Sequence, residues 1–462
     1  MLFRSDHSPE NWSELTAQEP DRYNEALQIV STQLEATVQS YFLGTLSGRA
    51  SYTLRNTSGA PQDLYFDLNP GYRVRSVTAN GVALAFEDLH NDFIASRELR
   101  CTLPAQQEIE LVIVYDGMPR IWNAQEEQLS GSIISSQSLS LSSMHLAPTV
   151  AGCASIASEE TPVTLQLDLP VSLVPVSTGS TKKLSDNPDG TCTWLFRNTG
   201  TDRIQLYAGD YTCAELSTGT GMPILFYYSQ KYRPRLQNGA IDLMEQAILY
   251  CTEHYGPRTG FTQDEPFKIV QLTGFLFGGF ANYNISGMGE SYFSDNNLQD
   301  PEKGASSAEV LAHEIIHQWW GLGATLADPD DPDWSDEGIT VYTTYRLMRK
   351  LMGQEYAQTH YVDQWQRAMQ NQRDNFYLRN PEYLRLLPER YQNDIQASVN
   401  ASNWYDGNAL MIYTAAQRLG EDKMDAIWSQ LYLEGGAELP PYITLGDFLS
   451  ACGLQEGEIS RG

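Results

Sequence analysis

The stretch His313-Glu314-Ile315-Ile316-His317-Gln318-Trp319-Trp320-Gly321 decides how this chain is interpreted. Its two histidines are four positions apart, so on a helix both imidazoles project from the same face. Ser306 and Glu309 form a capping-box pattern that can start such a helix, and Gly321 can end it. Two imidazoles on one helix face are a typical pair of zinc ligands, which leave room for a third ligand and a water.

Two carboxylates extend this pattern. Glu314 is adjacent to the first histidine, where it could take a proton from a metal-activated water and act as a general base. Glu337 follows His317 after 19 intervening residues and lies where a second helix is expected to begin. We therefore predict Zn²⁺ as the cofactor, with His313, His317 and Glu337 as its ligands. A chance occurrence of the pattern on a surface helix is the alternative, which the capped helix and the well-spaced third carboxylate disfavour.

Length, composition and charge restrict the remaining possibilities. The chain has 462 residues, which predicts two or three domains with apolar cores. Its formal net charge of −28 would repel phosphate backbones and anionic lipid, so a nucleic-acid partner is not expected. Six scattered cysteines indicate buried free thiols rather than a disulfide framework. With no signal sequence and no membrane-spanning run, we expect a soluble chain, cytoplasmic or cut from a larger membrane protein as its extracytoplasmic domain.

The first part of the chain has the pattern of an all-β domain. Residues 1–30 are polar and predict a lead-in segment. Between residues 31 and 216, short alternating strands are separated by turn residues, which is typical of a β-sandwich or saddle. Asn80-Gly81 between two such strands is a strong hairpin signal, because both residues tolerate a positive φ.

The second part, residues 217–462, predicts a mixed α/β and then helical domain. A helix is expected at 239–255, a buried strand at 268–272 and an extended segment at 285–293. Helices should dominate after residue 300. The expected fold class is thus a β-rich N-terminal domain followed by a mixed α/β and helical catalytic domain.

At three places the chain resembles the M1 family of zinc aminopeptidases. The stretch 313–321 is similar to the family's HExxHQW[FW]G, and Trp334-Ser335-Asp336-Glu337-Gly338 is similar to its WLNEG. Gly287-Met288-Gly289-Glu290-Ser291 is similar to its GAMEN exopeptidase motif. A softer match places Tyr405, in Tyr405-Asp406-Gly407-Asn408, at the position of the family's oxyanion-binding tyrosine. Nineteen residues separate His317 from Glu337, one more than the 18 usual in the family, which would point to Asp336 instead. Glu337 is preferred because it fits the family's Trp-x-x-Glu-Gly pattern and Asp336 does not.

The resemblance implies a thermolysin-like catalytic domain and a zinc aminopeptidase acting on peptides with a free N-terminus. Glu314 and Tyr405 would be catalytic, and Glu290 would bind the substrate's α-amino group. Gly287, Met288 and Gly289 would line the peptide backbone as an edge strand. Two alternatives stay open: a thermolysin-like endopeptidase, suggested by the 19-residue gap, and a peptide-binding or regulatory ectodomain without turnover.

Overall fold

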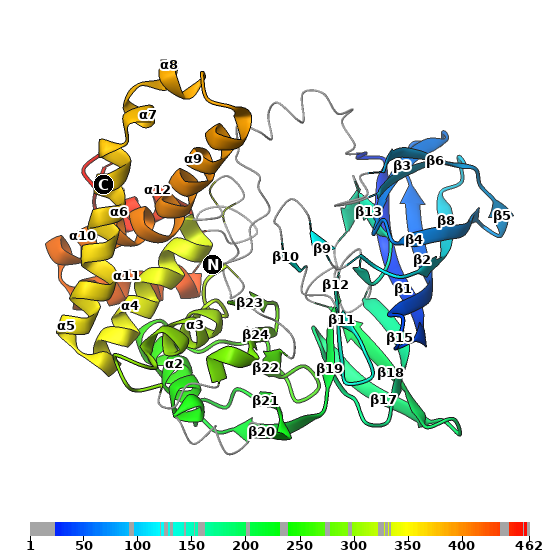
Figure 1. Ribbon diagram of the computed structural model, residues 1–462, viewed down its shortest axis with the longest axis horizontal. Helices are drawn as coiled ribbons and strands as arrows, with labels where there is room; N and C mark the ends of the chain where they lie inside the picture. The colour runs from blue at the N-terminus through cyan, green and yellow to red at the C-terminus, as the bar shows by residue number, and fades with distance from the viewer. Residues whose placement is uncertain are drawn as a thin grey trace.

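Strands make up the first half of the chain, and helices dominate the second half (Figure 1). The lead-in segment predicted at residues 1–30 falls largely outside the described part of the chain, and the first strand begins at Leu27. The computed structural model describes residues 24–91, 97–120, 122–123, 128–129, 133–142, 145–151, 153–155, 162–199, 204–231, 239–272, 278–293, 298–321, 328, 331, 334–434, 443–455 and 457–459.

One long sheet is the frame of the N-terminal half. Its strands follow the order β17-β18-β15-β1-β2-β8-β4-β5, with β14 beside β1. Asn80 and Gly81 join β4 to β5 with φ of 51° and 79°, which confirms the predicted hairpin. The strands of this half are β1 Leu27–Ser40, β2 Thr45–Asn56, β3 Gln62–Leu68, β4 Tyr72–Ala79, β5 Val82–Ala83, β6 Phe86–Asn91, β7 Arg97–Leu103, β8 Glu108–Gly117, β9 Trp122–Asn123, β10 Gln128–Leu129, β11 Ile133–Ile134, β12 Ser138–Ser142, β13 Thr149–Ala151, β14 Ala154–Ser155, β15 Val163–Pro170, β16 Val174–Ser177, β17 Ser180–Asp186, β18 Thr191–Asn198 and β19 Gln205–Gly209.

Smaller sheets pack against this frame and close an apolar core. They have the orders β13-β3-β7-β6 and β11-β12-β19-β16, with a separate hairpin β10-β9. Alternate residues of the strands point inward, so that Leu54, Phe66 and Ile113 of three different strands are fully buried in one cluster. The predicted all-β character of this half is confirmed.

A five-stranded mixed sheet begins the second half. Its order is β20-β21-β22-β24-β23, from β20 Tyr211–Leu216, β21 Ile224–Ser229, β22 Phe267–Leu272, β23 Gly279–Asn282 and β24 Ile285–Gly289. The three central strands are parallel, and β23 pairs antiparallel with β24 at the edge. Because β20 pairs with β21, the boundary predicted at residue 217 stays a prediction, and this pairing favours one nearer to Gly209.

The helices of the second half pack beside this sheet and around an aromatic core (Figure 1). Trp320, Trp334, Trp428 and Tyr432 are fully buried there, with several rings edge to face. The helices are α2 Ala240–His254, α3 Ala305–Ile316, α4 Ile339–Met352, α5 Gln354–Ala357, α6 Asp363–Asp374, α7 Phe376–Arg379, α8 Pro381–Leu384, α9 Glu389–Ser402, α10 Asn408–Leu419, α11 Glu421–Glu434 and α12 Leu445–Cys452, with the short turns η3 Glu290–Phe293, η4 Trp334–Gly338, η5 Gln358–Val362 and η6 Asn403–Gly407.

Two predicted helix starts differ from the structure. Helix α3 begins at Ala305 behind Gly304, with no side-chain cap, so Ser306 lies inside the helix and the predicted capping box is not formed. Glu337 does not begin an α-helix either. It lies in the π-helical turn η4, which precedes α4. Turns of this wider type are frequent at functional sites.

A buried polar contact joins the two halves. The Lys268 ammonium on β22 donates to the carbonyl oxygens of Ser177, at 2.7 Å, and Gly179. The Asn284 side chain accepts from Gly179 N and donates to Gly179 O. Phe280 on β23 stacks near Tyr207 of β19, with ring centroids 5.4 Å apart. These contacts fix the mixed sheet against the N-terminal half.

Candidate metal centre

Three predicted ligands converge at one point between α3 and η4. The Nε2 atoms of His313 and His317 are 3.1 Å apart. Glu337 Oε2 lies 3.2 Å from His313 Nε2 and 3.7 Å from His317 Nε2. The structure therefore brings together the three side chains that the sequence spacing selected.

These distances fit a tetrahedral zinc site. Ligand atoms about 2.0–2.1 Å from zinc at tetrahedral angles lie about 3.3 Å from each other. Glu337 Oε2 is also buried without a hydrogen-bond partner among the described residues, which is costly for a carboxylate unless a cation compensates. Burial opposes ionisation of Glu337, but the two imidazoles outweigh it and lower its pKa to about 2. The donor set thus suits a divalent ion of the zinc type.

Asp336 contacts the second histidine from outside the cluster of His313, His317 and Glu337. Its Oδ1 lies 2.7 Å from His317 Nδ1, on the side of the ring that faces away from the ligand cluster. This carboxylate fixes the ring orientation and leaves Nε2 for the metal. Gly321 makes the approach possible, because a Cβ there would lie 2.2 Å from Asp336 Oδ1. From the sequence, Asp336 was considered only as an alternative third ligand, and its contact with His317 was not predicted.

Glu314 points into the same centre from α3. It is 2% exposed, and burial raises its pKa to about 7. A carboxyl group that titrates near neutral pH can both accept and return a proton. Gly279 on β23 lies against it, because a Cβ at that position would be 2.4 Å from Glu314 Cγ.

Tyr405 reaches the centre from η6. Its hydroxyl donates a hydrogen bond of 3.2 Å to Glu337 Oε1. Gly338 lets the two turns approach, because a Cβ there would lie 2.6 Å from Asn408 Cβ. The predicted placement of Tyr405 beside the metal ligands agrees with this geometry.

A cavity of about 280 Å³ opens beside these groups. His313, Glu314 and Tyr405 line it, together with Gly278 and Gly279 at the start of β23. Glu309, His360 and Asp406 also line it. No spacing pattern in the sequence connects His360 to the metal centre.

The edge strand beside this cavity is β23, whereas the sequence predicted an edge strand at Gly287–Gly289. Residues Gly287–Gly289 belong to β24, which is buried and pairs with β22 on one side and β23 on the other. The prediction that they form an edge strand is therefore wrong. The stretch Gly278-Gly279-Phe280-Ala281-Asn282 also fits the Gly-x-x-x-Asn pattern of the exopeptidase motif, with Ala281 in place of its glutamate. Gly278 and Gly279 could have identified this stretch from the sequence. The later stretch was chosen instead because it contains a glutamate, Glu290.

Glu290 lies just beyond β24, in the turn η3, and is absent from the lining of this cavity. Its Oε1 lies 3.3 Å from the ammonium of Lys231, whose side chain is about half exposed. A substrate amine bound by Glu290 would have to share the carboxylate with this lysine. Its predicted role stays a prediction.

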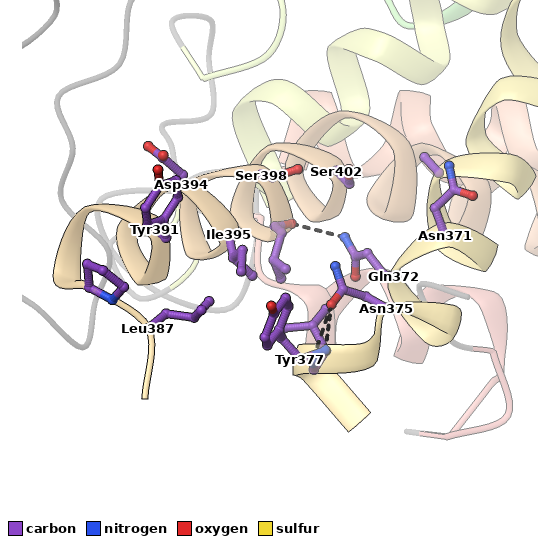
Figure 2. Close-up of a pocket in the computed structure, with 14 residues that line it drawn as sticks. Asn371, Gln372, Asn375, Tyr377, Leu387, Tyr391, Asp394, Ile395, Ser398 and Ser402 are labelled. Atoms are coloured by element: carbon purple, nitrogen blue, oxygen red, sulfur yellow. Dashed lines mark hydrogen bonds between the residues drawn. The ribbon is translucent and has the colours of Figure 1, made fainter. Parts of the chain in front are cut away.

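A larger cavity of about 620 Å³ lies elsewhere, between α6, α7 and α9. Figure 2 shows Tyr377, Leu387, Tyr391 and Ile395 around it. One wall is held by a 3.1 Å hydrogen bond from Gln372 Nε2 to the carbonyl of Val399. None of the metal-centre residues lines it, so size alone would misplace the chemistry.

Among the described residues, no helix is both long and apolar enough to span a bilayer.

Comparisons with known proteins agree with this geometry. Residues 240–435 match the peptidase family M1 domain. Over 169 residues the chain is 33% identical to leukotriene A-4 hydrolase of Xenopus laevis, covering 37% of this chain and 26% of that protein. It is 21% identical over 193 residues to probable aminopeptidase 1 of Saccharolobus solfataricus, covering 40% of this chain and 24% of that one. The chain thus spans about a quarter of the length of these relatives.

Among solved structures, an M1 zinc metallopeptidase from Deinococcus radiodurans, a mutant with a bound Tyr-Ser-Ala substrate, superposes with a TM-score of 0.58. It is 17% identical, and the match covers 93% of this chain and 92% of that one. Native yeast LTA4 hydrolase gives a TM-score of 0.60 at 16% identity, covering 92% of this chain and 64% of that one. At these identities the likeness establishes the fold, which confirms the predicted architecture.

Proposed function

We propose, from the match of residues 240–435 to the peptidase family M1 domain, that the chain is a zinc-dependent aminopeptidase that removes N-terminal residues from peptides. The observation that carries the proposal is the convergence of His313, His317 and Glu337 beside a cavity that His313, Glu314 and Tyr405 line. Three protein ligands leave a fourth position open, as catalytic zinc sites require.

Each side chain has a distinct role in this proposal. Zinc held by His313, His317 and Glu337 would supply a Lewis acid and lower the pKa of a coordinated water. Glu314 accepts a proton from the attacking water and returns it to the leaving amine, a role that suits its pKa near 7. Tyr405 donates a hydrogen bond to the oxyanion that develops on the scissile carbonyl. The buried position of Glu314 keeps competing water away from the transfer.

Recognition of the substrate's free amino group separates two candidate functions. Glu290 is the acidic candidate next to the mixed sheet, and several relatives of similar sequence are named aminopeptidases. A thermolysin-like endopeptidase is the second candidate. It is favoured by Ala281, which leaves the edge strand beside the cavity without the carboxylate of an exopeptidase motif.

Cleavage of paired peptides separates the two candidates. The zinc-loaded chain should cleave Leu-Ala-Ala faster than its N-acetylated form, by a factor of about ten or more, because the acetylated peptide cannot place an ammonium beside a carboxylate. Equal rates on both peptides would favour the endopeptidase. Glu290→Gln should reduce the discrimination, and Glu302→Gln, an exposed acid outside the site, serves as the matched control.

A further inference from the structure

Two carboxylates other than the proposed catalytic base line the cavity beside the metal centre. They belong to Glu309 and Asp406, and the described residues that line the cavity include no lysine or arginine. In the described part of the chain, neither Glu309 nor Asp406 has a lysine or arginine within ion-pair distance. Burial raises the pKa of Glu309 and raises that of Asp406 to about 6, so a cation bound in the cavity would stabilise both carboxylates in their ionised form. A cavity of this kind stabilises a cationic guest.

The rest of the lining suits a cation on an apolar stem. Val310 and Val341 give aliphatic surface, and Tyr361 and Trp365 give aromatic surface. Lysine and arginine bury a methylene stem along such surface while the charged end meets acidic groups. Aromatic faces also attract the charged end directly. A bare α-ammonium has no stem and would leave most of the 280 Å³ unfilled.

The position of Glu314 decides which substrate residue enters the cavity. Glu314 is the group proposed to return a proton to the leaving amine, and its side chain lines the cavity. The residue that carries the leaving amine is the second residue of the substrate. Glu309 lies one helical turn before His313 on α3, so it faces the same side of the helix as the ligand.

We infer that this cavity selects peptides whose second residue is lysine or arginine, with Glu309 and Asp406 as its specificity-determining residues. The inference rests on the proposed peptidase activity and goes beyond it, because it names the substrate class. It requires no change in the chemistry at the metal centre.

The test compares kcat/KM of the zinc-loaded chain on matched tripeptides. Ala-Lys-Ala is set against Ala-norleucine-Ala, in which the stem is kept and the charge is removed. Lys-Ala-Ala is set against norleucine-Ala-Ala, which places the same pair at the first residue. We expect a preference of about tenfold or more for lysine at the second residue, equivalent to about 1.4 kcal/mol. A ratio near one, or a preference confined to the first residue, would overturn the inference.

Variants connect the preference to the two acids. The lysine-to-norleucine ratio should fall by about threefold or more in Glu309→Gln and in Asp406→Asn, and should approach one in the double variant. Glu302→Gln should leave it unchanged. The ratio is insensitive to a general loss of rate, and an unaltered ratio in the double variant would contradict the assignment. Hydrolysis of leucyl-aminomethylcoumarin, which has no second residue, reports the proposed activity separately.

Discussion

Replacing Gly279 by alanine should slow catalysis without removing the metal. An ideal Cβ at this position lies 2.4 Å from Glu314 Cγ and 2.9 Å from its Oε1, whereas ordinary contact begins near 3.4 Å. The Glu314 side chain must therefore retreat by about 1 Å. A displacement of that size in a catalytic group costs about 100-fold in rate, or about 2.7 kcal/mol of barrier. The backbone itself should tolerate alanine, because Gly279 does not have a positive φ.

The assay is kcat on leucyl-aminomethylcoumarin together with zinc content. Gly446→Ala is the matched control, because a Cβ there meets only Thr444 Oγ1 at 3.5 Å. On a Glu314→Gln background, Gly279→Ala should cause no comparable further loss, since both changes act on one carboxylate. A kcat within threefold of the unmodified chain, or a full additional 100-fold loss in the double variant, would refute the reasoning.

Three further predictions concern other parts of the structure. Asp336→Asn should weaken zinc binding by about 10- to 100-fold, because the ring of His317 loses its anionic partner; chelator competition measures this, and an unchanged affinity would contradict it. Ala281→Glu restores a carboxylate on the edge strand and should increase the preference for free over N-acetylated peptides about tenfold; kcat/KM on both peptides checks it. Burial lowers the pKa of Lys268 to about 7, so the unfolded chain holds more protons than the folded one between about pH 7 and pH 10. Stability should accordingly rise with pH across that window relative to Lys268→Met, by at most about 1.4 kcal/mol per pH unit, as denaturant unfolding at several pH values would show.

The sequence predicted those features that depend on local spacing. Two histidines four apart on a helix must share a face, and the hairpin at Asn80-Gly81 follows from the φ that these residues accept. Neither depends on what lies elsewhere in the chain. Glu337 was selected because it fits the pattern Trp-x-x-Glu-Gly, not because of its distance from His317 along the chain. The structure places it beside both histidines.

What the sequence could not supply depends on pairing between distant segments. Strand β24 is glycine-rich and is followed directly by Glu290, but whether a strand lies at an edge depends on its neighbours, and β23 covers β24. His360 and Asp406 line the cavity from η5 and η6, which lie far beyond α3 along the chain. The supporting role of Asp336 depends on the close approach of Gly321, which becomes visible only in three dimensions.

One paired measurement tests the central claim most directly: zinc content and peptide cleavage of the unmodified chain and of Glu314→Gln, prepared side by side. Both proteins should bind one zinc per chain, because Glu314 is not a ligand. The unmodified chain should cleave peptides, lose activity with a chelator and regain it with zinc, while the Glu314→Gln variant keeps only a small residual activity. Cleavage that survives the chelator, or an undiminished Glu314→Gln variant, would contradict the account.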